Sequence, residues 1–219
     1  MLDKYLNKLE RKFGRFAIPD LMLYVVLGMG LIYVFDLVVS MNPNRTMALS
    51  PFLEFDRDLI LHGQVWRVIT FLLVPGFDNP VFTALALYFF WMLGTGLERA
   101  WGTFKFNVYF FLGALGCILA GFIVGRATNT YHYMSIFLAF AILYPNYEIL
   151  LFFIIPVKMK WLGMIDGALL LILFITGDMT QKVFLLLSLI NLVVFFGKSF
   201  FDRIYYTIRR YYYKWFKKL

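Results

Sequence analysis

The sequence predicts an all-α membrane protein that crosses the bilayer six times and carries a long, ordered first outer loop. Of its 219 residues, 62% are hydrophobic and 16% are charged, and the mean hydropathy is +0.75. Soluble domains are about 45–50% apolar and about 25% charged, so a soluble globule of this length could not cover so much apolar surface. The composition therefore excludes a soluble enzyme, a disordered tail and a fibrous repeat.

Six apolar runs are the expected spans, because a membrane helix needs about 20 mostly apolar residues. The fourth run stops at Pro145 and is too short to cross the hydrocarbon alone, so we expect it to be buried among the other helices. The apolar stretch Ile149–Val157, broken by Pro156, is expected to be an interfacial connector. The runs are Ile18–Val39, Pro80–Leu97, Phe104–Val124, Tyr131–Tyr144, Trp161–Ile175 and Val183–Phe196.

Basic segments flank this membrane domain of residues 18–199. Residues 1–17 are predicted to form an amphipathic cytoplasmic tail, and residues 200–219 a cytoplasmic tail that mixes basic and aromatic side chains. Most of the 21 Lys and Arg lie in these tails and in the loops after the second and fourth runs. Since Lys and Arg accumulate on the cytoplasmic side, both termini are expected inside. The net charge of +8 then indicates anionic lipid as the partner, and not nucleic acid.

No cleavable signal peptide is recognisable, since the first residues are polar and basic. This compact chain suits a multi-pass protein of a bacterial plasma membrane, and a eukaryotic endomembrane stays open as the alternative. The first outer loop, Ser40–Asn79, holds too many large apolar residues for a solvated linker. We expect it to be ordered in the outer leaflet, with Trp66 as an interfacial anchor and Arg67 beside it holding the loop.

Three motifs resemble the rhomboid superfamily, each at a span boundary. Gly63–Thr70 (GQVWRVIT) is similar to the rhomboid segment that leads from the first loop into the second span. Gly94–Gly102 (GTGLERAWG) resembles the glutamate–arginine signature after that span, with Gly94, Glu98, Arg99 and Gly102 at the matching positions. Tyr144–Asn146, with Pro145, and Phe152–Lys158, with Pro156, resemble the stretch that leaves the fourth span. The resemblance covers about Ile18–Phe201 and implies the six-span rhomboid fold.

The same resemblance implies a catalytic apparatus that this sequence lacks. Rhomboid proteases use a Ser in a G-x-S-G motif at the head of the fourth span, a His in the sixth, and a His-x-x-x-Asn pair in the second. Here no G-x-S-G occurs, no His follows His132, and the second-span positions fall near Phe82 and Ala86. The resemblance therefore points to the non-proteolytic branch, whose members bind transmembrane clients or act as scaffolds.

A substitute site could use His132 and Ser135, which lie three residues apart and so on one helical face. A Ser activated by a neighbouring His is the basic arrangement of nucleophilic catalysis. The alternative is structural: His132 hydrogen-bonds at the outer interface with Tyr131 and Tyr133, and Ser135 bonds back to its own helix. The structural alternative is favoured, because bulky Met134 and Ile136 flank the Ser.

Ionisable residues inside a membrane are costly and call for a functional hypothesis. Asp166 in the fifth run is expected to pair with Lys158, Lys160 or another basic residue. Together with Ser188 and Asn191 of the sixth run it could form a proton or ion path, although these polar groups are few. His62, the other His, does not make a zinc site, so neither a metal nor a cofactor is expected.

Small residues of the third run allow close approach of another helix. Gly121 and Gly125 have G-x-x-x-G spacing, which favours packing inside the bundle and leaves self-association into a homo-oligomer as the alternative. Glu98 and Arg99 are expected to join an ion-pair cluster near Lys105 that fixes two helix ends. The single cysteine, Cys117, is expected to be a buried hydrophobic residue.

The predicted function is a catalytically inactive rhomboid-like protein that binds transmembrane clients or scaffolds partners in the bilayer. The face between the second and fifth spans is where the resemblance would put the client. An intramembrane serine protease with an atypical site is the first alternative, and a transporter of ions or small solutes is the second.

Overall fold

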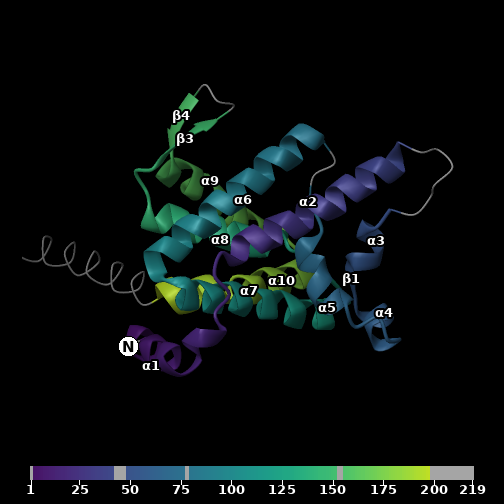
Figure 1. The fold of residues 1–219 in the computed structure, drawn as a ribbon, viewed down its shortest axis with the longest axis horizontal. Helices are drawn as coiled ribbons and strands as arrows, with labels where there is room; N and C mark the ends of the chain where they lie inside the picture. The colour runs from purple at the N-terminus through teal and green to yellow at the C-terminus, as the bar shows by residue number, and fades with distance from the viewer. Residues whose placement is uncertain (1, 42–47, 77–78, 152–154, 198–219) are drawn as a thin grey trace, which may run out of the picture.

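The computed structural model describes residues 2–41, 48–76, 79–151 and 155–197, and most of them are helical (Figure 1). Four helices are long and apolar enough to cross a membrane: α2 (Leu21–Ser40), α6 (Pro80–Trp101), α7 (Thr103–Val124) and α9 (Met159–Thr176). A bent pair, α10 (Met179–Ser188) and Ile190–Gly197, makes a fifth if it is one span. The chain is therefore a multi-pass membrane protein whose described part is largely α-helical.

The short helix α8 (Thr130–Leu143) lies at the centre of the bundle. It packs against α6, α7, α9 and α10, and its buried residues lie all around its axis. Ser135, Ile136 and Ala139 are fully buried. A helix of this length cannot span about 30 Å of hydrocarbon, and its neighbours shield it instead. The prediction that the fourth apolar run is buried among other helices is confirmed.

The outer surfaces of α2 and α9 remain apolar and exposed, as contact with lipid requires. Leu31 on α2 is 74% exposed and Ile175 on α9 is 73% exposed. On the inner faces, close approach depends on glycine: a Cβ on Gly94 of α6 would overlap the side chain of Met22 on α2. Gly102, with φ at +86°, joins α6 to α7 in a backbone conformation that side chains rarely adopt.

The first loop is ordered over residues 48–76, as predicted; Pro43 lies outside the described residues. Residues 48–76 contain four short helices and a strand. They lie at the opposite end of the bundle from α1 (Leu2–Phe13) and from the paired strands β3 (Glu148–Leu151) and β4 (Ile155–Lys158) (Figure 1). The elements of the first loop are α3 (Ser50–Leu53), β1 (Phe55–Asp56), α4 (Arg57–Leu61), α5 (Arg67–Thr70) and the 3₁₀ helix η2 (Phe71–Leu73).

Two short antiparallel pairings depart from a purely helical fold. β1 pairs with β2 (Arg126–Ala127), which joins the first loop to the connection between α7 and α8. β3 (Glu148–Leu151) pairs with β4 (Ile155–Lys158), so the expected interfacial connector is a hairpin. An amide group near a membrane needs a hydrogen-bond partner, and cross-strand pairing supplies one without a long helix.

Gly121 and Gly125 contact other parts of the same chain, in agreement with the favoured interpretation that their spacing serves packing inside the bundle. A Cβ on Gly121 would lie 2.6 Å from the ring of Phe55 in the first loop. Gly125 ends α7 with φ at +102° and accepts a hydrogen bond from the Arg57 backbone N–H at 2.9 Å. The two glycines therefore seat the first loop on the end of α7.

Candidate functional site

A polar cluster joins α7, α8 and the segment Ile190–Gly197 around Ser135. The Ser135 hydroxyl donates to the backbone carbonyl of His132 at 2.7 Å. The Asn191 side-chain amide donates to Ser135 Oγ at 2.9 Å and to the Tyr109 carbonyl at 3.3 Å, and the Tyr109 hydroxyl donates to the Ser135 carbonyl at 2.8 Å. Ser135 is therefore bonded back to its own helix, as the structural alternative predicts, and is also held by the residues after α10.

His132 lies beside this cluster but is not bonded to the Ser135 hydroxyl. Its side chain is fully buried, and neither ring nitrogen has a hydrogen-bond partner among the described residues. The imidazole packs edge-on against Phe110, with ring centroids 4.7 Å apart, in space left open by Gly113. The prediction that His132 hydrogen-bonds at the outer interface is wrong, because α8 turns this side chain toward α7 and not toward the membrane surface.

This geometry gives the Ser135 hydroxyl no general base in the described part of the chain. Nucleophilic catalysis needs a base within about 2.6–3.2 Å of the hydroxyl that it deprotonates. The Ser135 hydroxyl instead donates its hydrogen bond to the His132 carbonyl of the same helix, while the Asn191 amide donates a hydrogen bond to Ser135 Oγ. The arrangement is that of a hydrogen-bonded helix contact.

The sixth apolar segment bends by 48° between Ser188 and Ile190. Beyond the bend, Asn191 Oδ1 accepts from the backbone N–H of Leu192 at 2.8 Å, so a side chain enters the helical hydrogen-bond ladder. Cys117 is fully buried, as predicted, and its Sγ lies 3.3 Å from Ser188 Oγ. Ser188 and Asn191 thus serve helix contacts on either side of the bend.

Asp166 lines a separate, mostly apolar cavity of about 410 Å³ between α6, α8 and α9. Its side chain is 8% exposed, and Oδ2 has no hydrogen-bond partner within the described ranges. The expected pairing with Lys158 is wrong, since Lys158 Nζ lies 3.8 Å from Glu148 Oε1 across the hairpin. Lys160 lies over the ring of Trp161. The lining residues are Met29, Gly76, Ala86, Phe89, Phe90, Asn129, Thr130, Tyr133, Met134, Phe137 and Asp166.

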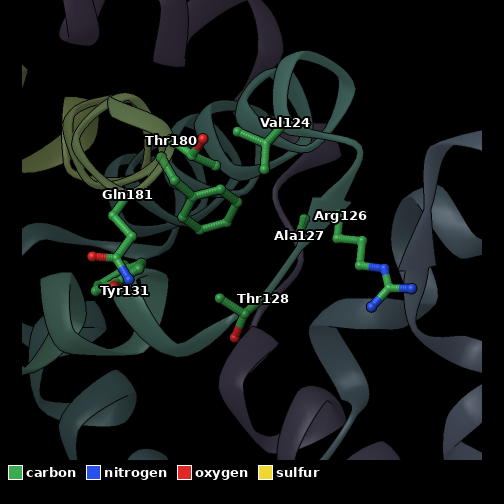
Figure 2. A pocket seen from close by; sticks show the side chains of 8 residues that line it. Val124, Arg126, Ala127, Thr128, Tyr131, Thr180 and Gln181 are labelled. Atoms are coloured by element: carbon green, nitrogen blue, oxygen red, sulfur yellow. The ribbon is translucent and has the colours of Figure 1, made fainter. Parts of the chain in front are cut away.

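A smaller cavity of about 270 Å³ lies where α7 ends and α8 and α10 begin (Figure 2). Thr180 and Gln181 line it from α10, Tyr131 from α8, and Thr128 from the connection between α7 and α8. The Arg126 guanidinium points away from these side chains in Figure 2. The Thr128 hydroxyl lies 2.8 Å from that of Thr130. This cavity carries hydroxyl and amide groups, and its described lining carries no acidic side chain.

The residues of the first motif hold the first loop together. Arg67 is 4% exposed, and its guanidinium donates to the carbonyls of Pro51 and Glu54 at 2.8 and 2.7 Å and to Gln64 Oε1 at 2.7 Å. Trp66 is half-exposed and donates through Nε1 to the Phe52 carbonyl at 3.1 Å. Trp66 and Arg67 therefore close the loop onto its own backbone.

The other motif residues lie at element boundaries. Glu98 Oε1 accepts from the backbone N–H of Asp20 at 3.2 Å, just before α2 begins, while Arg99 is exposed. Pro145 accepts at its carbonyl from the Lys160 backbone N–H at 3.0 Å, which fastens the end of α8 to the start of α9. Pro156 pairs with Leu150 in the hairpin.

Two buried Asn residues that sequence reasoning missed, Asn129 and Asn107, fix the surroundings of the site together with Tyr133. Asn129 donates to the carbonyls of Phe71, Leu72 and Val74, and the Tyr133 hydroxyl donates to Leu72 at 2.6 Å. Together they fasten the end of the first loop to the start of α8. Asn107 of α7 bonds both the N–H and the carbonyl of Ile18, at 2.8 and 2.9 Å. A lone Asn within or beside an apolar run was the signal that could have identified them.

Within the described ranges, no group of three or more His, Cys, Asp or Glu side chains could hold a metal ion. The site therefore consists of two parts: the hydrogen-bonded cluster around Ser135 and the cavity that contains Asp166. No protein-family model, curated protein or solved structure matches this chain.

Proposed function

We propose that this chain is a rhomboid-like membrane protein that binds transmembrane helices of other proteins without cleaving them. The observation that carries the proposal is the apolar cavity between α6, α8 and α9. It lies in a bundle whose candidate nucleophile, Ser135, donates its proton to a backbone carbonyl. A cavity with no activated nucleophile beside it suits recognition of a helix more than its hydrolysis.

The arrangement of elements supports the rhomboid-like part of the proposal. A long first loop closed by Trp66 and Arg67, a short central α8 and a signature at the end of α6 agree with what the three motifs imply. Counting α8 and the bent pair as one crossing each gives six crossings, which puts both termini on one side. The positive-inside rule favours the cytoplasm for that side, with the basic tails on anionic lipid, and we propose a bacterial plasma membrane as the location.

Lateral recognition is the proposed mechanism. α6 and α9 both pack on α8, and the cavity lies between them. A client helix would rest against exposed apolar residues such as Ile165 and Leu169 of α9, with its side chains entering the cavity that Phe89 and Phe137 line. Because lipid tails are as apolar as these residues, shape complementarity and hydrogen bonds would decide which client binds.

An atypical serine protease is the second candidate, favoured by one observation. Ser135, His132 and Asn191 gather in one buried cluster, and the Asn191 amide already donates to Ser135 Oγ. A rearrangement that turned the His132 ring toward Ser135 would create a nucleophile and its base. A transporter is the third candidate and depends on Asp166 as the intramembrane ionisable group.

A crosslinking experiment separates binding from cleavage. A photoreactive amino acid replaces Phe89, which lines the cavity, or Leu31, which faces outward on α2, in protein reconstituted with a panel of single-span reporter proteins. We expect full-length reporter crosslinked from position 89 and not from position 31, and no labelling of the protein by a fluorophosphonate probe. Cut reporter together with probe labelling that disappears in Ser135→Ala would overturn the proposal in favour of proteolysis.

The topology has its own test, since Cys117 is the only cysteine and is fully buried. The test introduces single cysteines at two exposed positions, Tyr5 of α1 and Leu61 of the first loop. In intact cells, a membrane-impermeant maleimide should label position 61 and leave position 5 unlabelled until the membrane is permeabilised. The reverse pattern would contradict cytoplasmic termini.

A further inference from the structure

The carboxyl of Asp166 is buried, and the described residues leave its Oδ2 without a hydrogen-bond partner. Asp166 is the eighth residue of α9, about 10 Å along the helix from Met159. It is 8% exposed, and its Oδ2 has no hydrogen-bond partner in the part of the chain that the structure describes. An ionisable group at this depth is costly unless something pairs with it.

The described lining of the cavity offers Asp166 no basic side chain, and the side chains of Asn129, Thr130 and Tyr133 are hydrogen-bonded elsewhere. The Asn129 amide donates to three carbonyls of the first loop, and the Tyr133 hydroxyl donates to Leu72. Lys160 of α9 lies over the ring of Trp161, and Lys158, which ends β4 just before α9, lies 3.8 Å from Glu148 Oε1. Among the described lining residues, Asp166 is therefore the one with a buried side-chain oxygen that has no hydrogen-bond partner.

We propose that the Asp166 cavity recognises a transmembrane helix by a Lys or Arg side chain that enters it and pairs with the Asp166 carboxylate. The occupant follows from charge complementarity: a single carboxylate in an apolar wall is matched by one cationic group on an apolar stem. Long basic side chains of this kind extend along apolar surfaces to reach a polar partner. A volume of about 410 Å³ accommodates such a side chain and its neighbours. This inference rests on the proposed function, because it names what the bound helix must carry.

Asp166 would also select among client helices, because helices with a basic, an apolar or an acidic side chain at this depth would interact with it differently. A Lys or Arg within a spanning helix is poorly tolerated by lipid, so a helix that carries one gains from a buried carboxylate. An all-apolar helix would leave Asp166 unpaired and gain only packing contacts. A helix with Glu or Asp at the same depth would place two acidic groups together, which is unfavourable.

The test measures binding of synthetic transmembrane peptides to the full-length protein in phosphatidylcholine vesicles. A series of Leu-rich peptides of about 21 residues is used, and each peptide carries a single Lys. The Lys moves one position from each peptide to the next through two helical turns, so that in one peptide it lies at the depth of Asp166. The matched peptides carry Leu or Glu at those positions. Fluorescence energy transfer from a labelled peptide to the labelled protein reports the dissociation constant.

We expect the best-placed Lys peptide to bind about 5- to 30-fold more tightly than its Leu counterpart, and the Glu peptide to bind least. Asp166→Asn should remove this preference and leave the Leu peptide unaffected, whereas Asp58→Asn, at an exposed carboxyl, should leave the preference intact. Ala86→Phe, which fills the cavity, should weaken every peptide. Circular dichroism melts would show that each variant is folded.

The outcomes separate the inference from the proposed function. If all peptides bind equally and Ala86→Phe still weakens them, helix binding stands and the role of Asp166 is overturned. If no peptide binds the unaltered protein, the proposed function itself fails. Tight binding of free n-butylammonium, abolished by Asp166→Asn, with no Lys preference among the peptides, would show that the cavity serves a small cation and overturn the helix as occupant.

Discussion

The side-chain amide of Asn191 donates a 2.9 Å hydrogen bond to the hydroxyl of Ser135, across the contact between the bent sixth segment and the central helix α8. The same amide reaches the Tyr109 carbonyl of α7 at 3.3 Å. One side chain thus ties together α7, α8 and the bent sixth segment. The bend beside Ser188 brings Asn191 to this position.

Asn191→Ala should destabilise this three-helix contact. The substitution leaves Ser135 Oγ without its donor and removes buried volume, so we expect the free energy of unfolding to fall by about 1–3 kcal/mol. Unfolding in mixed micelles, titrated with sodium dodecyl sulfate, measures the loss. Ser188→Ala is the control, because it removes only the weak interaction with Cys117. Equal losses in the two variants would contradict a special role of Asn191.

Two helical glycines should respond in opposite ways to the same substitution. A Cβ at Gly113 would lie 2.5 Å from both Asn191 Nδ2 and His132 Nδ1, whereas a Cβ at Gly167 of α9 meets nothing within 4 Å. Gly113→Ala should therefore lower the free energy of unfolding by about 1–3 kcal/mol. Gly167→Ala should leave it unchanged or raise it by up to about 1 kcal/mol. The same micelle titration compares them, and a neutral Gly113→Ala would show that the cluster can relax.

Arg67→Lys should loosen the first loop although it keeps the charge. A single ammonium cannot reproduce the planar set of bonds from Arg67 to Gln64, Pro51 and Glu54. We expect faster hydrogen exchange of backbone amides over residues 50–70, measured by mass spectrometry in detergent. Arg57→Lys is the matched control, since the partly exposed Arg57 side chain makes single, long bonds to Asp58 at 3.4 Å and to the Phe122 carbonyl at 3.3 Å, which an ammonium can replace. Unchanged exchange in Arg67→Lys would mean that other contacts hold the loop.

The helical part of this fold could be predicted because apolar length and turn residues are local properties of the sequence. The limits of α6, α7 and α8 agree with the apolar runs to within a few residues, and Pro145 does end α8. The sequence predicted an interfacial connector at Ile149–Val157 but did not predict that it forms a β-hairpin. Its apolar residues continue without the polar alternation that distinguishes a strand from an interfacial segment.

The candidate site was predicted less well, because its geometry depends on helix rotation and on pairs far apart in the chain. His132 and Ser135 were correctly placed on one helix, but sequence spacing does not tell which way α8 turns them. Asp166 was expected beside Lys158, which is near in sequence, yet the start of the hairpin supplies Glu148 instead. Contacts such as Asn191 to Ser135 arise only once α8 and the bent segment pack together.

Asn107→Ala should release the amino-terminal segment from the bundle. Its amide holds both backbone groups of Ile18 and lies beside the apolar groove between residues 13–17 and α7. We expect faster hydrogen exchange over residues 14–20 and little change in the spans. Asn79→Ala provides the comparison, because Asn79 caps the start of α6 and should alter exchange only there. Protection that persists at Ile18 in Asn107→Ala would mean that apolar contacts of α1 suffice.

His132→Leu separates a structural from a catalytic role for the buried histidine. Neither ring nitrogen is hydrogen-bonded to a described residue, so a Leu of similar volume removes two buried polar atoms without breaking a bond seen in the structure. Replacing an unpaired buried polar group by an apolar one is neutral or stabilising. We therefore expect an unchanged or higher free energy of unfolding and unchanged crosslinking of a transmembrane reporter from position 89. A loss of more than about 1 kcal/mol, or a loss of reporter crosslinking from position 89, would show instead that the imidazole takes a partner that the structure does not display.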